Sequence, residues 1–325
     1  MRAEILPFTA DHLPAAGRLL ADRHRRHRAA APLLSPRFED AATAEAEVAA
    51  TWKAEDSSGA VAVRDGEVVA YLLGAPKQSP MWGPNVWVES AGQACGGSDE
   101  DAELMRDVYA RAATRWMDEG RTAQYVLMPS YDAPLVDAWF RLGFGHQHAH
   151  AVRPSAITPR PLAAGLTLRE PRREDIAMLA RLELALPEHQ GLSPVFSAGQ
   201  VGTLEESIAE WEEDWGDPAF HVVVAEVDGQ VVGHAVGCAA TIGSTNLGLT
   251  RPDDAGFLGF AAVLPEARGH GAGRALGEAV IAWSAEAGYT SIVTDWRATN
   301  LLSSRTWPAL GWETTFLRLH RTVGY

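Results

Sequence analysis

Apolar and polar positions along the chain follow strand-like and helix-like periods, and the same order of periods occurs twice. Residues 5–13 change from an apolar run to a polar helix start, and residues 168–176 repeat that change 163 positions later. Residues 61–70 are two apolar runs joined by an Asp-Gly pair, which predicts a β-hairpin. Residues 223–233 show the same signature, where the Asp-Gly pair again lies 163 positions later. A tandem duplication of one domain explains the repeat.

A third match extends the duplication towards the C terminus. Residues 139–144 and 307–312 share the pattern Trp-x-x-Leu-Gly-aromatic and lie 168 positions apart. Each half then predicts strand, helices, hairpin, strand, long helix, strand, helix and strand, which is an α+β fold with a mixed sheet flanked by helices. Three prolines between residues 154 and 161 disfavour helix. We therefore expect domains at residues 1–153 and 165–325, joined by a Pro-rich linker at residues 154–164.

The most informative stretch is a glycine-rich turn in the second half. The apolar run of residues 257–264 predicts a strand, and apolar residues at helical spacing after residue 274 predict a helix that begins within the glycines. The first N–H groups of such a helix have no intrahelical partner, so they form a site for an anion. Arg268 and Arg274 add positive charge. The glycine spacing matches neither the nucleoside triphosphate P-loop nor the dinucleotide-binding fingerprint.

The stretch resembles the acyl-CoA pyrophosphate loop of the GNAT superfamily of N-acetyltransferases, which is usually Arg or Gln-x-x-Gly-x-Gly or Ala. Arg268, Gly271 and Gly273 supply this pattern. Downstream features of the family follow in order, namely Asn300, Ser303, an aromatic residue at Trp307 and Gly311-Trp312. With the duplication, the chain resembles a tandem two-domain GNAT protein of actinobacterial type.

The resemblance implies a mostly antiparallel sheet that splays at its middle strands, with acetyl-CoA as co-substrate in the splay and no metal. It implies a backbone N–H of Ala261 as donor to the oxyanion. Trp307 departs from the family, because tyrosine at that position is thought to protonate the leaving thiolate and an indole cannot. The residues expected to contact acetyl-CoA are Ala261, Ala262, Val263, Arg268, Gly269, His270, Gly271, Ala272, Gly273, Arg274, Asn300, Ser303 and Trp307.

The duplication provides an internal comparison for this site. The counterpart of the glycine-rich turn, 168 positions earlier, is residues 100–105, which hold three carboxylates and no glycine. Negative charge there suits a helix start but repels a pyrophosphate. The counterpart of Asn300 is Asp132. We expect the domain of residues 1–153 to be degenerate and not to bind acetyl-CoA.

The sequence offers several candidates for the group that accepts the amine proton. His234 follows the second hairpin turn, and an imidazole has a suitable pKa. Asp254 precedes the central strand. His234 and Asp254 are the catalytic candidates, with Asp253, Asp295 and a chain of water molecules as alternatives. Residues 210–215 combine carboxylates with two indoles, which suits an organic cation but is also typical of a solvated helix face.

Composition narrows the classes of partner. The net charge is −14, which argues against nucleic acid. Residues from 161 onward hold 11 Lys and Arg against 21 Asp and Glu, net −10, whereas residues 1–160 hold 17 against 21, net −4. The acidity suits a cationic substrate. The chain has two cysteines and no apolar run of membrane-spanning length, so we expect no structural metal, no membrane association, and a cytoplasmic monomer or homodimer.

Three functions are compatible with the sequence. The first is an N-acetyltransferase that transfers the acetyl group of acetyl-CoA to a primary amine of a small, cationic molecule by direct attack in a ternary complex. The second is a mycothiol-synthase-like acetyltransferase. The third is a non-catalytic acyl-CoA sensor or binding module.

Overall fold

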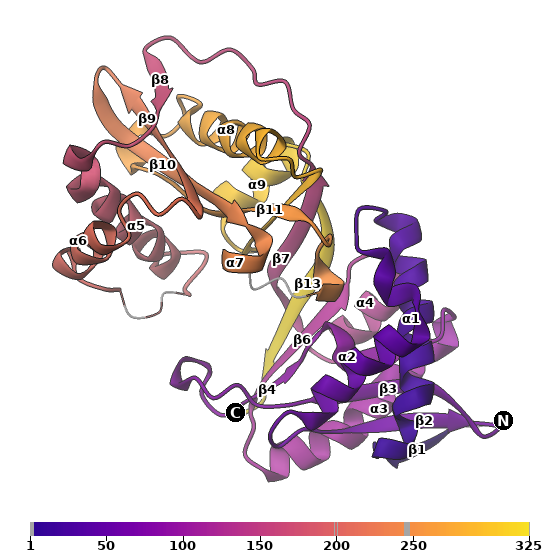
Figure 1. Ribbon diagram of the computed structural model, residues 1–325. Coiled ribbons are helices and arrows are strands. Elements are labelled where there is room, and N and C mark those ends of the chain that lie inside the picture. Colours follow the sequence, from indigo (N-terminus) through magenta and orange to yellow (C-terminus); the bar gives the residue numbers. More distant parts are fainter. Residues whose placement is uncertain (1–2, 198, 200, 244–247, 325) are drawn as a thin grey trace. The chain divides into compact units, whose positions relative to one another are not determined.

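The computed structural model describes residues 3–197, 199, 201–243 and 248–324, which form helices packed on open sheets (Figure 1). The predicted α+β fold class is confirmed. The chain divides into two compact units. The N-terminal unit holds residues 1–149, 248–250 and 314–325, and the C-terminal unit holds residues 150–247 and 251–313.

In the N-terminal unit, alternate strand residues face two helical layers. Ala60, Ala62 and Leu72 pack with α3 (Asp99–Asp118), and Val61 and Tyr71 pack with α1 (Leu13–Ala30) and α2 (Ala41–Lys53). The strands follow the orders β1-β2-β3-β5 and β4-β6-β13-β7. The elements that begin in this half of the sequence are β1 (Glu4–Pro7), α1 (Leu13–Ala30), α2 (Ala41–Lys53), β2 (Ser58–Arg64), β3 (Glu67–Gly74), β4 (Asn85–Val88), β5 (Gln93–Cys95), α3 (Asp99–Asp118), β6 (Ala123–Pro129), α4 (Ala133–Arg141) and β7 (Gly145–Pro154).

In the C-terminal unit the strand order is β7-β12-β11-β10-β9-β8, and helices cover both faces of the sheet (Figure 1). Gly233 of β10 lies against Leu276 of α8, whereas the ring of the next residue, His234, contacts Trp211 of α6. The elements are β8 (Leu166–Arg169), α5 (Ile176–Gly191), α6 (Leu204–Glu213), β9 (Phe220–Val227), β10 (Gln230–Ala239), α7 (Ala240–Gly243), β11 (Ala255–Val263), α8 (Ala272–Glu286), β12 (Ser291–Arg297), α9 (Leu301–Ala309) and β13 (Glu313–Thr322).

The bounds of these elements confirm the predicted duplication. The first residues of α1 and α5 lie 163 positions apart in the sequence. The first residues of β6 and β12, of α4 and α9, and of β7 and β13 each lie 168 positions apart. Both predicted hairpins are present. Their Asp-Gly turns have positive φ at both positions, which a type I′ turn requires: 54° and 82° at Asp65 and Gly66, and 50° and 77° at Asp228 and Gly229.

The last strands of the two halves are exchanged. In the repeat, β7 corresponds to β13 and β6 corresponds to β12. Nevertheless β13 pairs antiparallel with β6, and β7 is the neighbour of β12. Residues 314–325 therefore belong to the N-terminal unit, although the sequence places them in the domain of residues 165–325. The Pro-rich segment after Pro154 contains no helix or strand before Leu166, and it belongs to the C-terminal unit.

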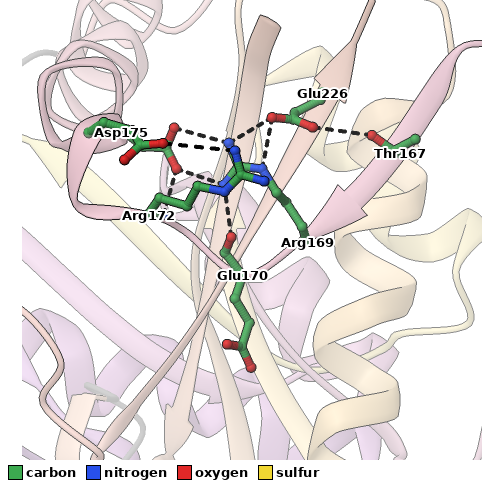
Figure 2. Close-up of polar contacts among 7 residues, drawn as sticks. Thr167, Arg169, Glu170, Arg172, Asp175 and Glu226 are labelled. Atoms are coloured by element: carbon green, nitrogen blue, oxygen red, sulfur yellow. Dashed lines mark hydrogen bonds and ion pairs between the residues drawn. The ribbon is translucent and has the colours of Figure 1, made fainter. Parts of the chain in front are cut away.

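An ion-pair network fixes the start of the C-terminal unit (Figure 2). The Arg169 guanidinium at the end of β8 donates to the carboxylates of Asp175 and Glu226. Asp175 ends the 3-10 turn before α5, and its carboxylate also accepts from the backbone N–H of Arg172 at 2.6 Å. Glu226 lies on β9. The network thus joins β8, β9 and the N-terminus of α5.

Candidate functional site

The glycine-rich turn between β11 and α8 leaves a row of backbone donors free. Gly269 and Gly271 have φ of 87° and 83°, a conformation that favours glycine, and Gly271 is the N-cap of α8. The N–H groups of residues 269–274 have no acceptor among the described residues, whereas the N–H of Ala275 already donates to the Gly271 carbonyl. Six consecutive donors at a helix N-terminus form a site for an anion.

A cavity of about 310 Å³ opens at this turn, and we call it the glycine-loop cavity. It lies within the C-terminal unit, between β11, the turn, α9 and α5. Twelve of the thirteen residues predicted to contact acetyl-CoA line it; the exception is the exposed His270. The predicted residues in the lining are Ala261, Ala262, Val263, Arg268, Gly269, Gly271, Ala272, Gly273, Arg274, Asn300, Ser303 and Trp307.

The two arginines at this cavity differ in how they are paired. Arg274 donates to Glu278 at 2.9 Å and to the carbonyl of Pro161 at 3.1 Å. Burial favours a raised pKa for the Glu278 carboxyl, but hydrogen bonds from Arg160 and Arg274 outweigh it and lower the pKa. Arg268 has no carboxylate partner in the described part of the chain, and its Nε donates to the Val263 carbonyl at 3.3 Å. Arg268 therefore keeps its positive charge uncompensated at the cavity.

The strand pair beside the cavity separates as the resemblance predicts. Strands β11 and β12 run parallel and pair only as far as Phe257 and Val293. The Thr294 hydroxyl donates to the Leu258 carbonyl at 2.9 Å, just where the ladder stops. Beyond that point no described strand pairs with the edge of β11 towards Ala261 on the β12 side. Such an edge can supply the backbone N–H that stabilises an oxyanion.

Asn300 and Trp307 each contact neighbouring residues and also line the cavity. The Asn300 side chain caps α9, because its Oδ1 accepts from the N–H groups of Leu302 and Ser303 at 3.1 and 3.4 Å. Its side-chain NH₂ group is the part that remains for another ligand. Trp307 is 8% exposed, and its ring lies edge-on to Trp312 at 5.5 Å. The Trp307 indole therefore forms one wall of the cavity.

The two catalytic candidates do not line the cavity. The ring of His234 is fully buried, and neither ring nitrogen has a partner among the described residues. Burial lowers its pKa to about 3, which makes it a weak proton acceptor. Asp254 is exposed at the other end of β11, roughly 23 Å from Ala261 along an extended strand. The hairpin turn before His234 and the central strand after Asp254 suggested these residues, but neither side chain lines the cavity.

The residues predicted to contact acetyl-CoA do not include the wall that α5 contributes. Ala185, Leu186 and His189 of this helix line the cavity, as do Leu302 and Thr306 of α9. The spacing of the three α5 residues is that of one helical face, so the periodicity was present in the sequence. It could not show which strand that face packs against.

A second cavity of about 470 Å³ lies in the same unit, around α6 and the loop that follows it. Glu210, Trp211, Asp214 and Trp215 line it, so residues 210–215 are not only a solvated helix face. No group of His, Cys, Asp and Glu in the described part of the chain could hold a metal ion, and Cys95 and Cys238 are buried free thiols. None of the helices described has the length and apolar character of a membrane span.

Comparisons with known proteins agree with the geometry. Residues 187–312 match the model of the acetyltransferase (GNAT) family. A GCN5-related N-acetyltransferase from Sphaerobacter thermophilus is similar over 100% of this chain and 97% of its own, with a TM-score of 0.57 at 15% identity. A glucosamine N-acetyltransferase region of a fungal multi-domain GH3 β-N-acetylglucosaminidase matches 98% of this chain and 38% of its own, with a TM-score of 0.54 at 13% identity.

A tandem GNAT protein from the clavulanic acid biosynthesis pathway aligns with 99% of this chain and 99% of its own, with a TM-score of 0.48 at 15% identity. The search among curated proteins finds no match. Because the Sphaerobacter structure is only 15% identical in sequence, its likeness to this chain establishes the fold alone.

Proposed function

We propose that the C-terminal unit binds acetyl-CoA in the glycine-loop cavity and transfers the acetyl group to a primary amine of a small, cationic molecule. The proposal rests on the backbone and the charge of the glycine-rich turn. Gly269 and residues 271–274, whose N–H groups have no acceptor among the described residues, line one cavity together with Arg268, which has no carboxylate partner there. That arrangement fits a pyrophosphate, which carries negative charge and accepts many hydrogen bonds. The match of residues 187–312 to the GNAT family supports acyl transfer as the reaction.

The chemistry requires little from side chains. A neutral amine nitrogen attacks the thioester carbonyl, so that a C–N bond forms and the C–S bond breaks, and the amine proton leaves to water. The free edge of β11 near Ala261 offers a backbone donor to the oxyanion. The thiolate is a good leaving group, since a thiol has a pKa of about 8.5. Direct attack in a ternary complex therefore needs no covalent enzyme intermediate.

We further propose one acetyl-CoA site per chain, because other groups fill the position in the N-terminal unit that corresponds to the glycine-loop cavity. Helices α3 and α8 end at equivalent positions of the repeat, but α3 begins more than one turn earlier than α8, so a helical turn replaces the glycine-rich turn. The Ser98 side chain caps that turn by accepting from the N–H of Asp101 at 3.2 Å. Three carboxylates, Asp99, Glu100 and Asp101, lie in the first turn. At this position the N-terminal unit therefore has a capped helix start in place of free N–H groups, and carboxylates in place of positive charge.

Two arginines also fill the N-terminal counterpart of the cavity. Gln93 and Cys95 of β5 pair with Leu72 and Ala70, as Ala261 and Val263 of β11 pair with Ala235 and Gly233. The repeat that relates α1 to α5 puts Arg23 where Leu186 stands and Arg26 where His189 stands.

The side chains of both arginines turn onto this strand. Arg23, which is 1% exposed, donates to the Gln93 and Ser90 carbonyls, and Arg26 donates to the Cys95 carbonyl at 2.8 Å. Guanidinium groups thus bond to the strand that would face the pantetheine arm.

Turnover with a panel of amines tests the proposal. Acetyl-CoA is incubated with the full chain and di- and polyamines, aminoglycosides or amino acids, and the free CoA thiol and the mass of the acetylated amine are measured. Release of CoA matched by an acetylated amine is the expected result. Binding of acetyl-CoA without release across the panel would favour the acyl-CoA sensor. Activity confined to a cysteine-linked amino sugar would favour the mycothiol-synthase-like alternative.

A further inference from the structure

The second cavity of the C-terminal unit is acidic and has no fixed positive charge in its wall. The described residues of its lining include the carboxylates of Glu170, Glu183, Glu210, Asp214 and Asp217, and no Lys or Arg. We call it the acidic cavity. Its one histidine is His221, whose ring stacks flat on Trp283 at 5.2 Å. Burial lowers the His221 pKa and so disfavours the charged form of the ring.

These carboxylates have no counterion among the described residues. Glu170, Glu210, Asp214 and Asp217 form no ion pair there. Figure 2 shows that Glu170 gives only its backbone carbonyl to Arg169, at 2.8 Å, while its side chain leads away from the ion-pair network. Glu183 is half-buried and accepts from the Ser207 hydroxyl at 2.7 Å. A cavity with this lining is unfavourable for an anion and favourable for a cation.

Aromatic rings complete the wall. Trp211 and Trp215 are half-buried and line the acidic cavity together with Phe220. The face of an indole attracts an organic cation, and most strongly when water is partly excluded. A hydrated metal ion gains nothing from such rings, so the lining favours an organic ligand with both apolar surface and positive charge.

The acidic cavity adjoins the glycine-loop cavity along two elements. On the sheet, Val236 lines the acidic cavity and pairs with Phe260, the residue before Ala261 of the glycine-loop cavity. On α5, Glu183 lines the acidic cavity, and Leu186, one turn later, lines the glycine-loop cavity. A molecule in the acidic cavity can therefore direct one end towards β11, where the strands separate.

We infer that the acidic cavity holds the amine substrate and that this substrate carries at least one further cationic group, as a di- or polyamine does. The inference rests on the proposed function. Glu183 lies nearest to the glycine-loop cavity along α5 and faces the reacting end, whereas Glu210, Asp214 and Trp215 hold the distal cation.

Acetylation explains how the product leaves such a pocket. The amine loses its proton before attack, the C–N bond forms as the C–S bond breaks, and the product is a neutral amide at that end. The product carries one positive charge fewer than the substrate. It is therefore held less firmly by the carboxylates and is released.

Calorimetry with two probes and two matched double variants tests the inference on the full chain. The probes are spermidine and the monoamine 1-aminobutane. The variant Glu210→Gln/Asp214→Asn removes two charges from the lining of the acidic cavity. The control Glu212→Gln/Glu213→Gln removes the same charge from exposed positions of the same helix that do not line it.

We expect the wild-type chain to bind spermidine at least about tenfold more tightly than 1-aminobutane. We expect the cavity variant to weaken spermidine binding by about tenfold and the control by less than about twofold, with acetyl-CoA affinity unchanged in both. Equal weakening in the two variants, or no preference for spermidine, would overturn the inference. Acetyl-CoA binding without spermidine binding overturns the inference and leaves the proposed function standing. Spermidine binding without acetyl-CoA binding would overturn the proposed function and leave the acidic cavity as a cation site without a role in acetyl transfer.

Discussion

Arg169 donates to both carboxylate oxygens of Asp175, at 2.7 and 3.0 Å, and this bidentate pair joins the first strand of the C-terminal unit to the start of α5. The Arg169 guanidinium, followed by the backbone N–H of Arg172, lowers the pKa of the Asp175 carboxyl against the effect of burial. The side chains are 18% and 9% exposed, so water screens the pair little.

This pairing predicts an acid-dependent stability. A lowered folded-state pKa means that the contribution of Asp175 is present above its unfolded pKa of about 3.9. The contribution is lost as the pH falls through the folded value. Asp175→Asn should lower the free energy of unfolding by about 2 kcal/mol at pH 7, with a smaller difference below about pH 4. Urea unfolding between pH 3 and 7 measures this. Glu174→Gln, at an exposed neighbour, is the control and should change little. A pH-independent difference would contradict the assignment.

The second prediction concerns the glycine-rich turn. Gly271→Glu places a carboxylate beside the free N–H groups and forces a residue with a side chain into φ of 83°. We expect the dissociation constant of acetyl-CoA to rise at least about a hundredfold. Gly288→Glu is the matched control, because Gly288 has φ of 92° just after the C-terminus of the same helix and open space around it. An unchanged affinity in a folded Gly271→Glu variant would show that the pyrophosphate lies elsewhere.

The third prediction is one acetyl-CoA per chain. Calorimetry of the wild-type chain should give a stoichiometry of one, because α3 and the pair Arg23 and Arg26 occupy the N-terminal counterpart of the site. In Gly271→Glu the stoichiometry should fall towards zero. If that variant still binds one acetyl-CoA with wild-type affinity, the N-terminal unit holds the site and the assignment of the two units is reversed.

The repeat explains how much of this architecture the sequence could predict. Turns and loops depend on local chemistry, so the Asp-Gly hairpins and the glycine-rich turn could be predicted from a few adjacent residues. The exchange of β7 and β13 could not be predicted from the sequence. The duplicated strands β6 and β12 have equivalent edges, so the last strand of either half can pair with either edge. The acidic cavity depends on how α6 and its loop pack over β9 and β10, which neither charge nor periodicity specifies.

The fourth prediction concerns His234, which the sequence suggested as a base. His234→Leu removes two ring nitrogens that have no hydrogen-bond partner among the described residues, so we expect the free energy of unfolding at pH 7 to change by less than about 1 kcal/mol. Because the folded-state pKa is about 3 and the unfolded value is about 6.5, wild-type stability is lost as the pH falls between these values. The variant should lose less stability in that range, as unfolding at pH 4 and pH 7 can show. A hundredfold loss of turnover with acetyl-CoA affinity intact would make His234 catalytic after all.

The last prediction concerns Trp307, where the chain departs from the family pattern. An indole cannot deliver a proton to the leaving thiolate, but it can pack against the pantetheine arm. In the structure the side chain is largely buried between Trp312 and α8, and a methyl group at Gly277 would lie 3.1 Å from its ring, so the ring fills its space closely. Its counterpart Trp139 is fully buried in the unit that we propose does not bind acetyl-CoA, which also indicates a packing role.

Trp307→Tyr should therefore leave the turnover rate within about tenfold, which corresponds to about 1.4 kcal/mol in the barrier. A thiolate with a pKa near 8.5 can leave without an enzyme acid, so a phenol at this position adds little to the chemical step. Any loss should instead follow weaker acetyl-CoA affinity, since a smaller ring leaves space beside Gly277. Single-turnover kinetics of Trp307→Tyr and Trp307→Phe separate the two effects. If tyrosine raises the chemical step a hundredfold and phenylalanine does not, proton delivery limits the native enzyme, and the packing role assigned to Trp307 is wrong.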